Sequence, residues 1–99
     1  MQELDPIQID EGETAASPFR LTLRGSMGLD NVRDLHLAAE ELASRGRDVE
    51  VDCSGPTRLD LAAIQVLIAL AIDLGRAGHE CRVLGVPPGT KRHMEFAGL

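Results

Sequence analysis

The hydrophobic pattern of this chain changes from a period of two residues to a period of three or four and back again. Residues 19–24 alternate apolar and polar side chains, which is typical of a strand with one buried face. In residues 29–43 the apolar side chains recur at steps of three and four, as on an amphipathic helix, and Gly46 stands where a C-cap glycine belongs. Residues 48–53 alternate again. Two strands joined through a helix are therefore predicted, and such a unit pairs its strands in parallel with a right-handed crossover.

A second helix is predicted over the apolar stretch 61–74, which only two polar residues interrupt. Such a composition predicts a helix buried against the sheet and its neighbours rather than one lying at the surface. Asp60 precedes it as an N-cap candidate, because a carboxylate can accept hydrogen bonds from the free amides of a first helical turn. Leu59 and Ile64 take the N′ and N4 positions of a hydrophobic staple. Gly78 is expected to end the helix.

Shorter patterns complete the expected order of elements. Residues 6–10 and 81–86 indicate two further strands, and Pro87-Pro88 opens a last helix, since proline suits the first helical position. Residues 25–28 are expected to break the strand before them, and residues 54–57 are expected to form a loop. The predicted fold is an α/β domain with a mixed, mostly parallel four-stranded sheet covered by about three helices.

The length of 99 residues suits a single domain spanning residues 1–99, in which residues 1–5 are expected to be flexible. Five acidic residues without a balancing base fall within the first thirteen positions, either as a solvated stretch or as an acidic docking segment. Cys53 should end one strand and Cys81 should begin its parallel neighbour, at opposite ends of the sheet. The two thiols are therefore expected to be reduced core side chains rather than a disulfide.

Several functional classes are disfavoured by composition. A net charge of −6 argues against nucleic acid, because neutralising phosphates requires clustered lysine and arginine. No apolar run approaches the ~20 residues that span a bilayer and no signal-peptide pattern is present, so a cytoplasmic protein without membrane insertion is expected. The cysteines show neither CxxC spacing nor a nearby histidine cluster, so no metal or other cofactor is expected.

Catalytic motifs are missing from the sequence, which has no phosphate-binding loop, no GxGxxG after a strand and no GxSxG nucleophile elbow. His36 falls beside a buried helical stripe, where a hydrogen-bonded structural role is expected, while His79 and His93 are expected to be solvated. Asp52 and Asp60 flank one loop, but each already has a structural place. The sequence therefore predicts a protein that is not an enzyme.

An ordered set of motifs covers nearly the whole chain. Residues 49–74 combine a strand, a Ser-Gly-Pro-Thr segment and a long apolar helix, and residues 83–87 and 91–99 supply a closing strand and helix. Together they resemble the STAS domain, which anti-sigma-factor antagonists share with the cytoplasmic tails of sulfate transporters. Near position 25 the family often has Gly-Glu-Leu-Asp, of which only Gly25 matches. The resemblance implies an α/β module for protein–protein interaction.

In phosphorylated STAS proteins the helix after the loop opens with Asp-Ser-Ser-Gly, and the second serine is the switch. The matching positions here are Asp60, Leu61, Ala62 and Ala63. An alanine methyl cannot accept phosphate, so the charge of about −1.5 to −2 that would repel a partner cannot be installed at Ala62. A phosphorylated antagonist that uses Ser54 or Thr57 remains an alternative.

The resemblance implies a non-enzymatic adaptor in bacterial signal transduction that binds a regulatory protein of the anti-sigma or kinase-like kind. The expected partner-binding residues are Gly28, Thr57, Asp60, Leu61, Ala62, Ala63 and Gln65. Leu61 either forms an exposed patch there or packs under the loop. The alternative function is the cytoplasmic STAS subunit of an ABC-type lipid transporter, docked on its ATPase, which the short chain resembles. A sheet edge left open could also pair with a second copy in a homodimer.

Overall fold

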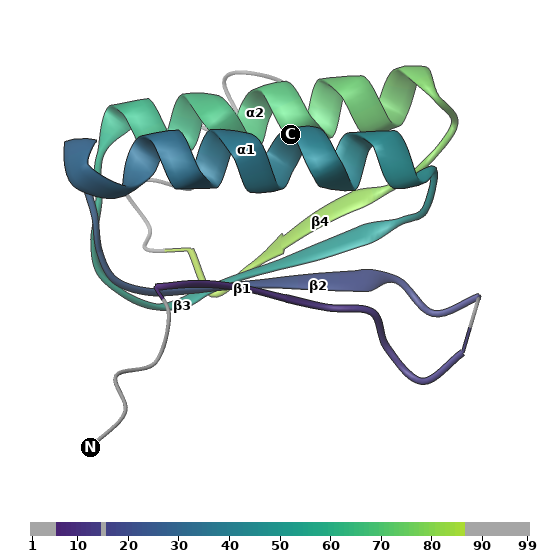
Figure 1. Ribbon diagram of the computed structural model, residues 1–99, viewed down its shortest axis with the longest axis horizontal. Coiled ribbons are helices and arrows are strands. Elements are labelled where there is room, and N and C mark those ends of the chain that lie inside the picture. The colour runs from purple at the N-terminus through teal and green to yellow at the C-terminus, as the bar shows by residue number, and fades with distance from the viewer. Residues whose placement is uncertain (1–5, 15, 87–99) are drawn as a thin grey trace.

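The computed structural model describes residues 6–14 and 16–86, which form two layers (Figure 1). Four strands make one sheet in the order β1-β2-β3-β4, in which β1 runs antiparallel to β2 and the other neighbours are parallel. Both described helices lie on the same face of this sheet (Figure 1). The elements are β1 (Ile7–Asp10), β2 (Phe19–Met27), α1 (Leu29–Arg45), β3 (Val49–Leu59), α2 (Leu61–Arg76) and β4 (Cys81–Leu84).

The predicted α/β class and its mixed, mostly parallel four-stranded sheet are confirmed. The described residues contain two helices rather than about three. The third was predicted from Pro87 onward, and that segment lies outside the described residues, as do residues 1–5, which were expected to be flexible.

The core lies between the sheet and the two helices. In the β2–β3 register Phe19 pairs with Val49 and Leu21 pairs with Val51, so apolar side chains meet side by side on the face that the helices cover. All four are buried, and Leu35 of α1 and Leu67 of α2 close over them. Because the side-chain period of a strand is two, a slip of one residue would turn this apolar row to the opposite face.

The ends of α1 follow the sequence signals. Its C-cap is Gly46 in the left-handed region, at φ 69° and ψ 41°, as the glycine after the apolar pattern predicted. Arg47 comes next and anchors the turn between β1 and β2, because its guanidinium donates to the carbonyl oxygens of Thr14, at 2.9 Å, and of Ser17. The same guanidinium stacks over the Phe19 ring, 4.4 Å from its centroid.

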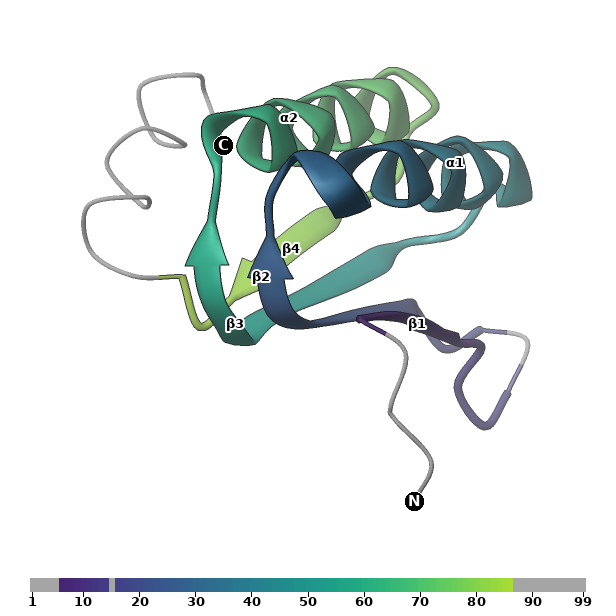
Figure 2. The ribbon, with the colours of Figure 1, turned by 60° about the vertical axis from the view of Figure 1, so that its left-hand side comes forward.

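β2 and β3 are longer than the sequence predicts, so the expected break at 25–28 and the expected loop at 54–57 are wrong. The ladder continues to Met27 and Leu59 through register shifts, which lie between Thr22 and Arg24 and between Gly25 and Ser26. Shifts of this kind bend paired strands without separating them. Figure 2 shows both strand ends turning toward the helix layer.

Gly55 makes this bend possible. A Cβ atom at position 55 would lie 2.4 Å from the carbonyl oxygen of Leu23 on the neighbouring strand, so only a residue without a side chain allows the two backbones to approach this closely. A Gly-Pro pair usually marks a loop. Here Gly55 instead permits pairing to continue past Pro56.

α2 is not buried all round, contrary to the prediction from its composition. Its buried residues are Ala63, Ile64, Leu67, Leu70 and Leu74. On the side away from the sheet Leu61 is 60% exposed and Ile72 is 44% exposed. A helix in a two-layer fold is covered on one side only, and composition alone does not report the number of layers. Neither described helix is long and apolar enough to cross a membrane.

The two cysteines are free, as predicted. Cys81 pairs with Val49 and so begins its strand as predicted, but Cys53 lies within β3 rather than at its end, because that strand continues to Leu59. Burial raises the pKa of Cys53 to about 12 and the pKa of Cys81 to about 11. Both side chains are therefore neutral thiols near pH 7.

Candidate partner-docking site

Both helices begin at the same end of the sheet, directly after the C-terminal ends of β2 and β3 (Figure 2). Gly28 is the N-cap of α1 and Asp60 is the N-cap of α2. The amide of Asp60 donates to the carbonyl oxygen of Met27 at 3.0 Å, so the end of β2 holds the start of α2. The tertiary structure thus brings Gly28 beside Asp60, two of the residues predicted for one site.

Asp60 occupies the predicted N-cap position, but its side chain makes no capping hydrogen bond, so the expected role of the carboxylate is wrong. Main-chain contacts define the helix start instead. Besides the bond to Met27, the carbonyl oxygen of Asp60 accepts from the amide of Ile64 at 3.0 Å. Ile64 is buried and Leu59 packs against the core, in keeping with the predicted staple.

The first residues of α2 differ in how far their side chains are exposed to solvent. Leu61 is 60% exposed, which decides between the two alternatives for this side chain in favour of an outward patch. Gln65 is exposed and Ala62 is half-buried, so both can be reached from solvent. Ala63 is 1% exposed and packs inward. Thr57 lies within β3 rather than in a loop.

A shallow groove between α1 and α2 adjoins this helix start. Its volume is about 470 Å³, and its walls are Val32, Arg33 and His36 from α1 and Ala62, Gln65, Val66 and Ala69 from α2. Ala62 and Gln65 were predicted site residues, whereas the α1 wall was missed. The amphipathic pattern of α1 includes Val32, but no sequence signal states that this part of α1 lies against α2.

The location of His36 differs from the one predicted. It stands on the exposed side of α1, where its Nε2 lies 2.8 Å from Oε1 of Glu40 one turn later. The predicted hydrogen-bonded role is therefore present, but at the surface rather than beside the core. His79 is half-buried at the turn before β4, with its Nδ1 3.5 Å from Oδ1 of Asp48, so it is less solvated than expected. His93 lies outside the described residues.

The Ser54 hydroxyl does not lie on the same side of the sheet as the start of α2. Cys53 points into the core, so Ser54, the next residue on β3, is directed to the sheet face opposite the two described helices, where it is exposed. Its hydroxyl and amide both donate to Oδ1 of Asp52, at 2.5 and 3.0 Å. These bonds, led by the one from the hydroxyl, lower the pKa of Asp52.

The chemistry of the site is that of a contact surface. It offers an exposed leucine and a shallow groove with mostly apolar walls, whose α1 side carries the cationic Arg33 and the imidazole of His36. In residues 6–14 and 16–86 no group of three His, Cys, Asp or Glu side chains could hold a metal ion. Fold and site together define an α/β module in which the start of α2 leaves an apolar surface uncovered beside a groove.

A module of this class corresponds to a known protein family. The chain belongs to the STAS family, because the family model described as "Mlab, STAS domain" matches residues 12–99. The comparison with curated proteins gave no match.

Two solved structures share the fold. The anti-sigma factor antagonist SpoIIAA in its unphosphorylated form superposes with a TM-score of 0.77 at 11% identity, covering 91% of this chain and 82% of that one. An antisigma-factor antagonist STAS domain from Rhodobacter sphaeroides gives a TM-score of 0.61 at 21% identity, covering 80% of this chain and 84% of that one. At these identities the likeness establishes the fold.

Proposed function

We propose that this chain is a non-enzymatic, cytoplasmic STAS adaptor that binds a regulatory protein, of the anti-sigma or kinase-like kind, through the start of α2. The observation that carries the proposal is Leu61, which stands 60% exposed beside the α1–α2 groove. An apolar side chain held out by a rigid helix beside an apolar groove gives a partner contiguous apolar area to bury. Gly28, Thr57, Asp60, Ala62 and Gln65 complete the proposed site, whereas the buried Ala63 supports it from the core.

The adaptor would bind without a phosphate switch at position 62. Ala62 lines the groove with a methyl group, so no kinase can place a charge there. The Ser54 hydroxyl is exposed, but it lies on the sheet face opposite the two described helices, away from the start of α2. If phosphate-affinity electrophoresis of protein from its native cells gave a shifted band that Ser54→Ala or Thr57→Ala removes, a phosphorylated antagonist would replace this proposal.

The test is capture of partners by the tagged full chain in its native cells, compared between two matched variants. Leu61→Glu places a carboxylate on the proposed contact, whereas Leu84→Glu makes the same change at a 41% exposed leucine of β4. Desolvating a carboxylate in an interface is costly, so Leu61→Glu should reduce capture of the main partner about tenfold or more. Leu84→Glu should leave it unchanged, and the far-UV circular dichroism of both should match the parent. Equal capture by all three proteins would show that α2 is not the interface.

A second candidate is the STAS subunit of an ABC-type lipid transporter, and the match to the family model described as Mlab favours it. In that case α2 would dock on an ATPase subunit. The same capture experiment distinguishes the two. Mass spectrometry that identifies an ABC ATPase lost with Leu61→Glu would support the transporter subunit, and a kinase-like or sigma-regulating protein would support the adaptor.

A further inference from the structure

A second groove runs along the opposite side of α1, between this helix and the edge strand β1. Its larger part has a volume of about 420 Å³, and Ile7, Ile9, Leu37 and Ala38 contribute apolar walls. A smaller hollow of about 230 Å³ adjoins it, and Ile9 and Glu41 line both. We call this feature the α1–β1 groove. Figure 1 shows β1 at the near edge of the sheet below α1, away from α2.

The apolar surface of the groove is incompletely covered. Leu37 is 56% exposed although it lies in the middle of α1, and Ile7 and Ile9 are half-buried at the sheet edge. An exposed leucine alone is ordinary. A leucine that continues a concave surface of two isoleucines and an alanine is the floor of a docking groove, because a ligand side chain placed there would bury apolar area on several sides.

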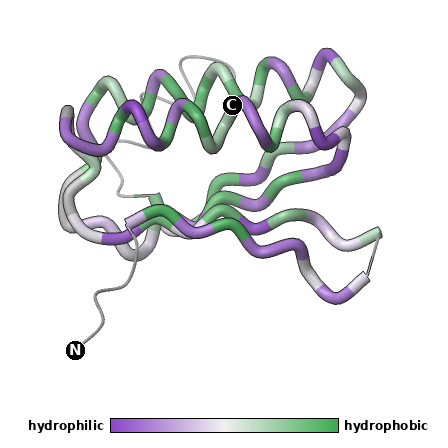
Figure 3. The backbone as a smooth tube through the Cα atoms, viewed as in Figure 1, coloured by the Kyte–Doolittle hydropathy of each residue, from purple (hydrophilic) through white to green (hydrophobic). Residues whose placement is uncertain are grey.

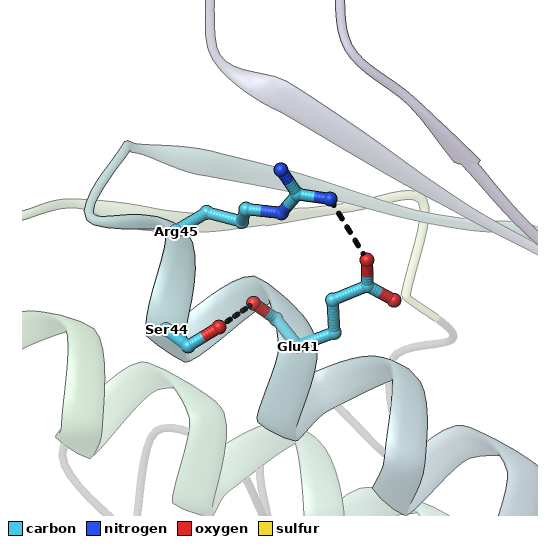
Figure 4. Close-up of polar contacts among 3 residues, drawn as sticks. All are labelled: Glu41, Ser44 and Arg45. Carbon is cyan, nitrogen blue, oxygen red and sulfur yellow. Dashed lines mark hydrogen bonds and ion pairs between the residues drawn. The ribbon is translucent and has the colours of Figure 1, made fainter.

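The charges around the groove are mostly negative. Asp34 and Glu41 lie on the α1 wall and Glu11 lies beyond the end of β1, whereas Arg45 is the one basic side chain among the lining residues. Arg45 is already engaged, since its Nη2 lies 3.0 Å from Oε1 of Glu41 (Figure 4). The rim therefore keeps an excess of carboxylates. An anionic lipid surface or a nucleic acid would be repelled there, and a basic segment would be attracted.

The length of the groove sets the size of its occupant. From Asp34 to Arg45 the α1 wall rises about 16 Å, at ~1.5 Å per residue, which equals about three helical turns. An amphipathic helix with one apolar stripe and flanking lysine or arginine matches this length and this pairing of apolar floor and acidic rim.

We propose that the α1–β1 groove binds a cationic amphipathic segment of a partner protein. Apolar side chains of the segment would sit on Leu37 and Ile9, and basic side chains would face Asp34 and Glu41. The proposal does not depend on the α2 surface, because none of the residues that line the α1–β1 groove lines the α1–α2 groove. One partner, or two, can therefore occupy both sides of α1 together.

The test uses the full chain and a defined probe, a fluorescein-labelled 14-residue helical peptide of leucine and lysine, followed by fluorescence anisotropy at about 0.15 M salt. Glu41→Lys and Glu40→Lys change the net charge equally at neighbouring positions, but Glu40 lines neither part of the groove. We expect Glu41→Lys to raise Kd about tenfold and Glu40→Lys to raise it less than about threefold. Equal weakening by the two variants would mean attraction to net charge only and would overturn the proposal.

Three further variants, one of them a control, test the apolar floor and the sign of the charge effect. Leu37→Ser should raise Kd several-fold, whereas Ile72→Ser, at the exposed isoleucine of α2, should not. Arg45→Gln should lower Kd, because it releases the Glu41 carboxylate for the peptide. In chemical-shift mapping, the peptide should shift the amide resonances of Ile7, Ile9 and Ala38. Shifts confined to Ala62 and Gln65, absence of binding to the parent chain, or a dimer of the chain that Glu41→Lys dissociates would each overturn the proposal.

Discussion

On the sheet face that the helices cover, Leu21, Val49 and Val51 have no exposed surface, whereas Arg20 and Glu50, their immediate neighbours, stand on the opposite face in contact with solvent. Figure 3 shows this as alternating green and purple along the strands. The covered face supplies most of the burial that drives folding. The open face is organised differently, by charged side chains that pair between neighbouring strands.

A row of alternating charge crosses all four strands on the open face. In the ladder Asp10 stands opposite Arg20, Arg20 opposite Glu50, and Glu50 opposite Arg82. Arg20 and Glu50 form an ion pair, with Nη2 3.5 Å from Oε2. Opposite charges that face each other on neighbouring strands stabilise the pairing by a few tenths of a kcal/mol, up to about 1 kcal/mol each. The covered face is therefore held by apolar burial, which also sets the register, whereas the open face adds paired charges between neighbouring strands.

The difference between the two sheet faces is tested most strongly by truncating two consecutive residues of β2 that face opposite ways. Leu21→Ala should lower the free energy of unfolding by about 2–5 kcal/mol, because it leaves a cavity in the covered layer. Thr22→Ala, one residue later on the open face, should cost less than about 1 kcal/mol. Urea unfolding followed by circular dichroism measures both. Similar losses for the two variants would show that the open face also carries packing.

The charge row can be tested by reversal. Glu50→Arg places a third basic residue between Arg20 and Arg82, and should lower the free energy of unfolding by about 0.5–1 kcal/mol. Adding Arg20→Glu restores an Arg–Glu pair and should recover part of the loss. The recovery should shrink at 1 M salt, since the pair is solvent-exposed. If the effects of the two substitutions are simply additive at low salt, these charges do not interact.

The smallest expected effect is a pH dependence at Asp52. Bonds from Ser54 lower the pKa of Asp52, so the ionised carboxylate favours the folded state, and this contribution is lost as the pH falls through the lowered pKa. The difference in stability between the parent and Asp52→Asn should therefore be larger at pH 6 than at pH 3. Urea unfolding at both values checks the prediction. A constant difference would mean that the Ser54–Asp52 bonds do not depend on the charge.

Much of the fold follows from local patterns. The alternation in residues 19–24 and 48–53, the helical spacing before Gly46 and the apolar stretch from Leu61 identify four of the six described elements, because the side-chain period of each element is built into its backbone geometry. The ends of β2 and β3 do not follow, since Gly25 and Gly55 signal turns locally. Pairing across the two strands overrode those signals and continued the ladder.

The candidate sites were predictable only in part. The position of Asp60 at the start of α2 could be read from the chain, but the missing cap bond and the outward direction of Leu61 could not. Neither groove has a sequence signature, because each joins residues of two elements that are distant along the chain. Glu41 and Ile9, for instance, meet only after β1 has paired with β2 and α1 has packed above them.

By itself the sequence determined the order of strands and helices, the parallel pairing that their alternation requires, and the absence of a phosphate acceptor at Ala62. These depend on side-chain periodicity and on residue identity, which are local. Only the tertiary structure decided that α2 is covered on one side and that grooves flank α1. Those features depend on which surfaces remain uncovered after the layers pack, and that is a property of the whole domain.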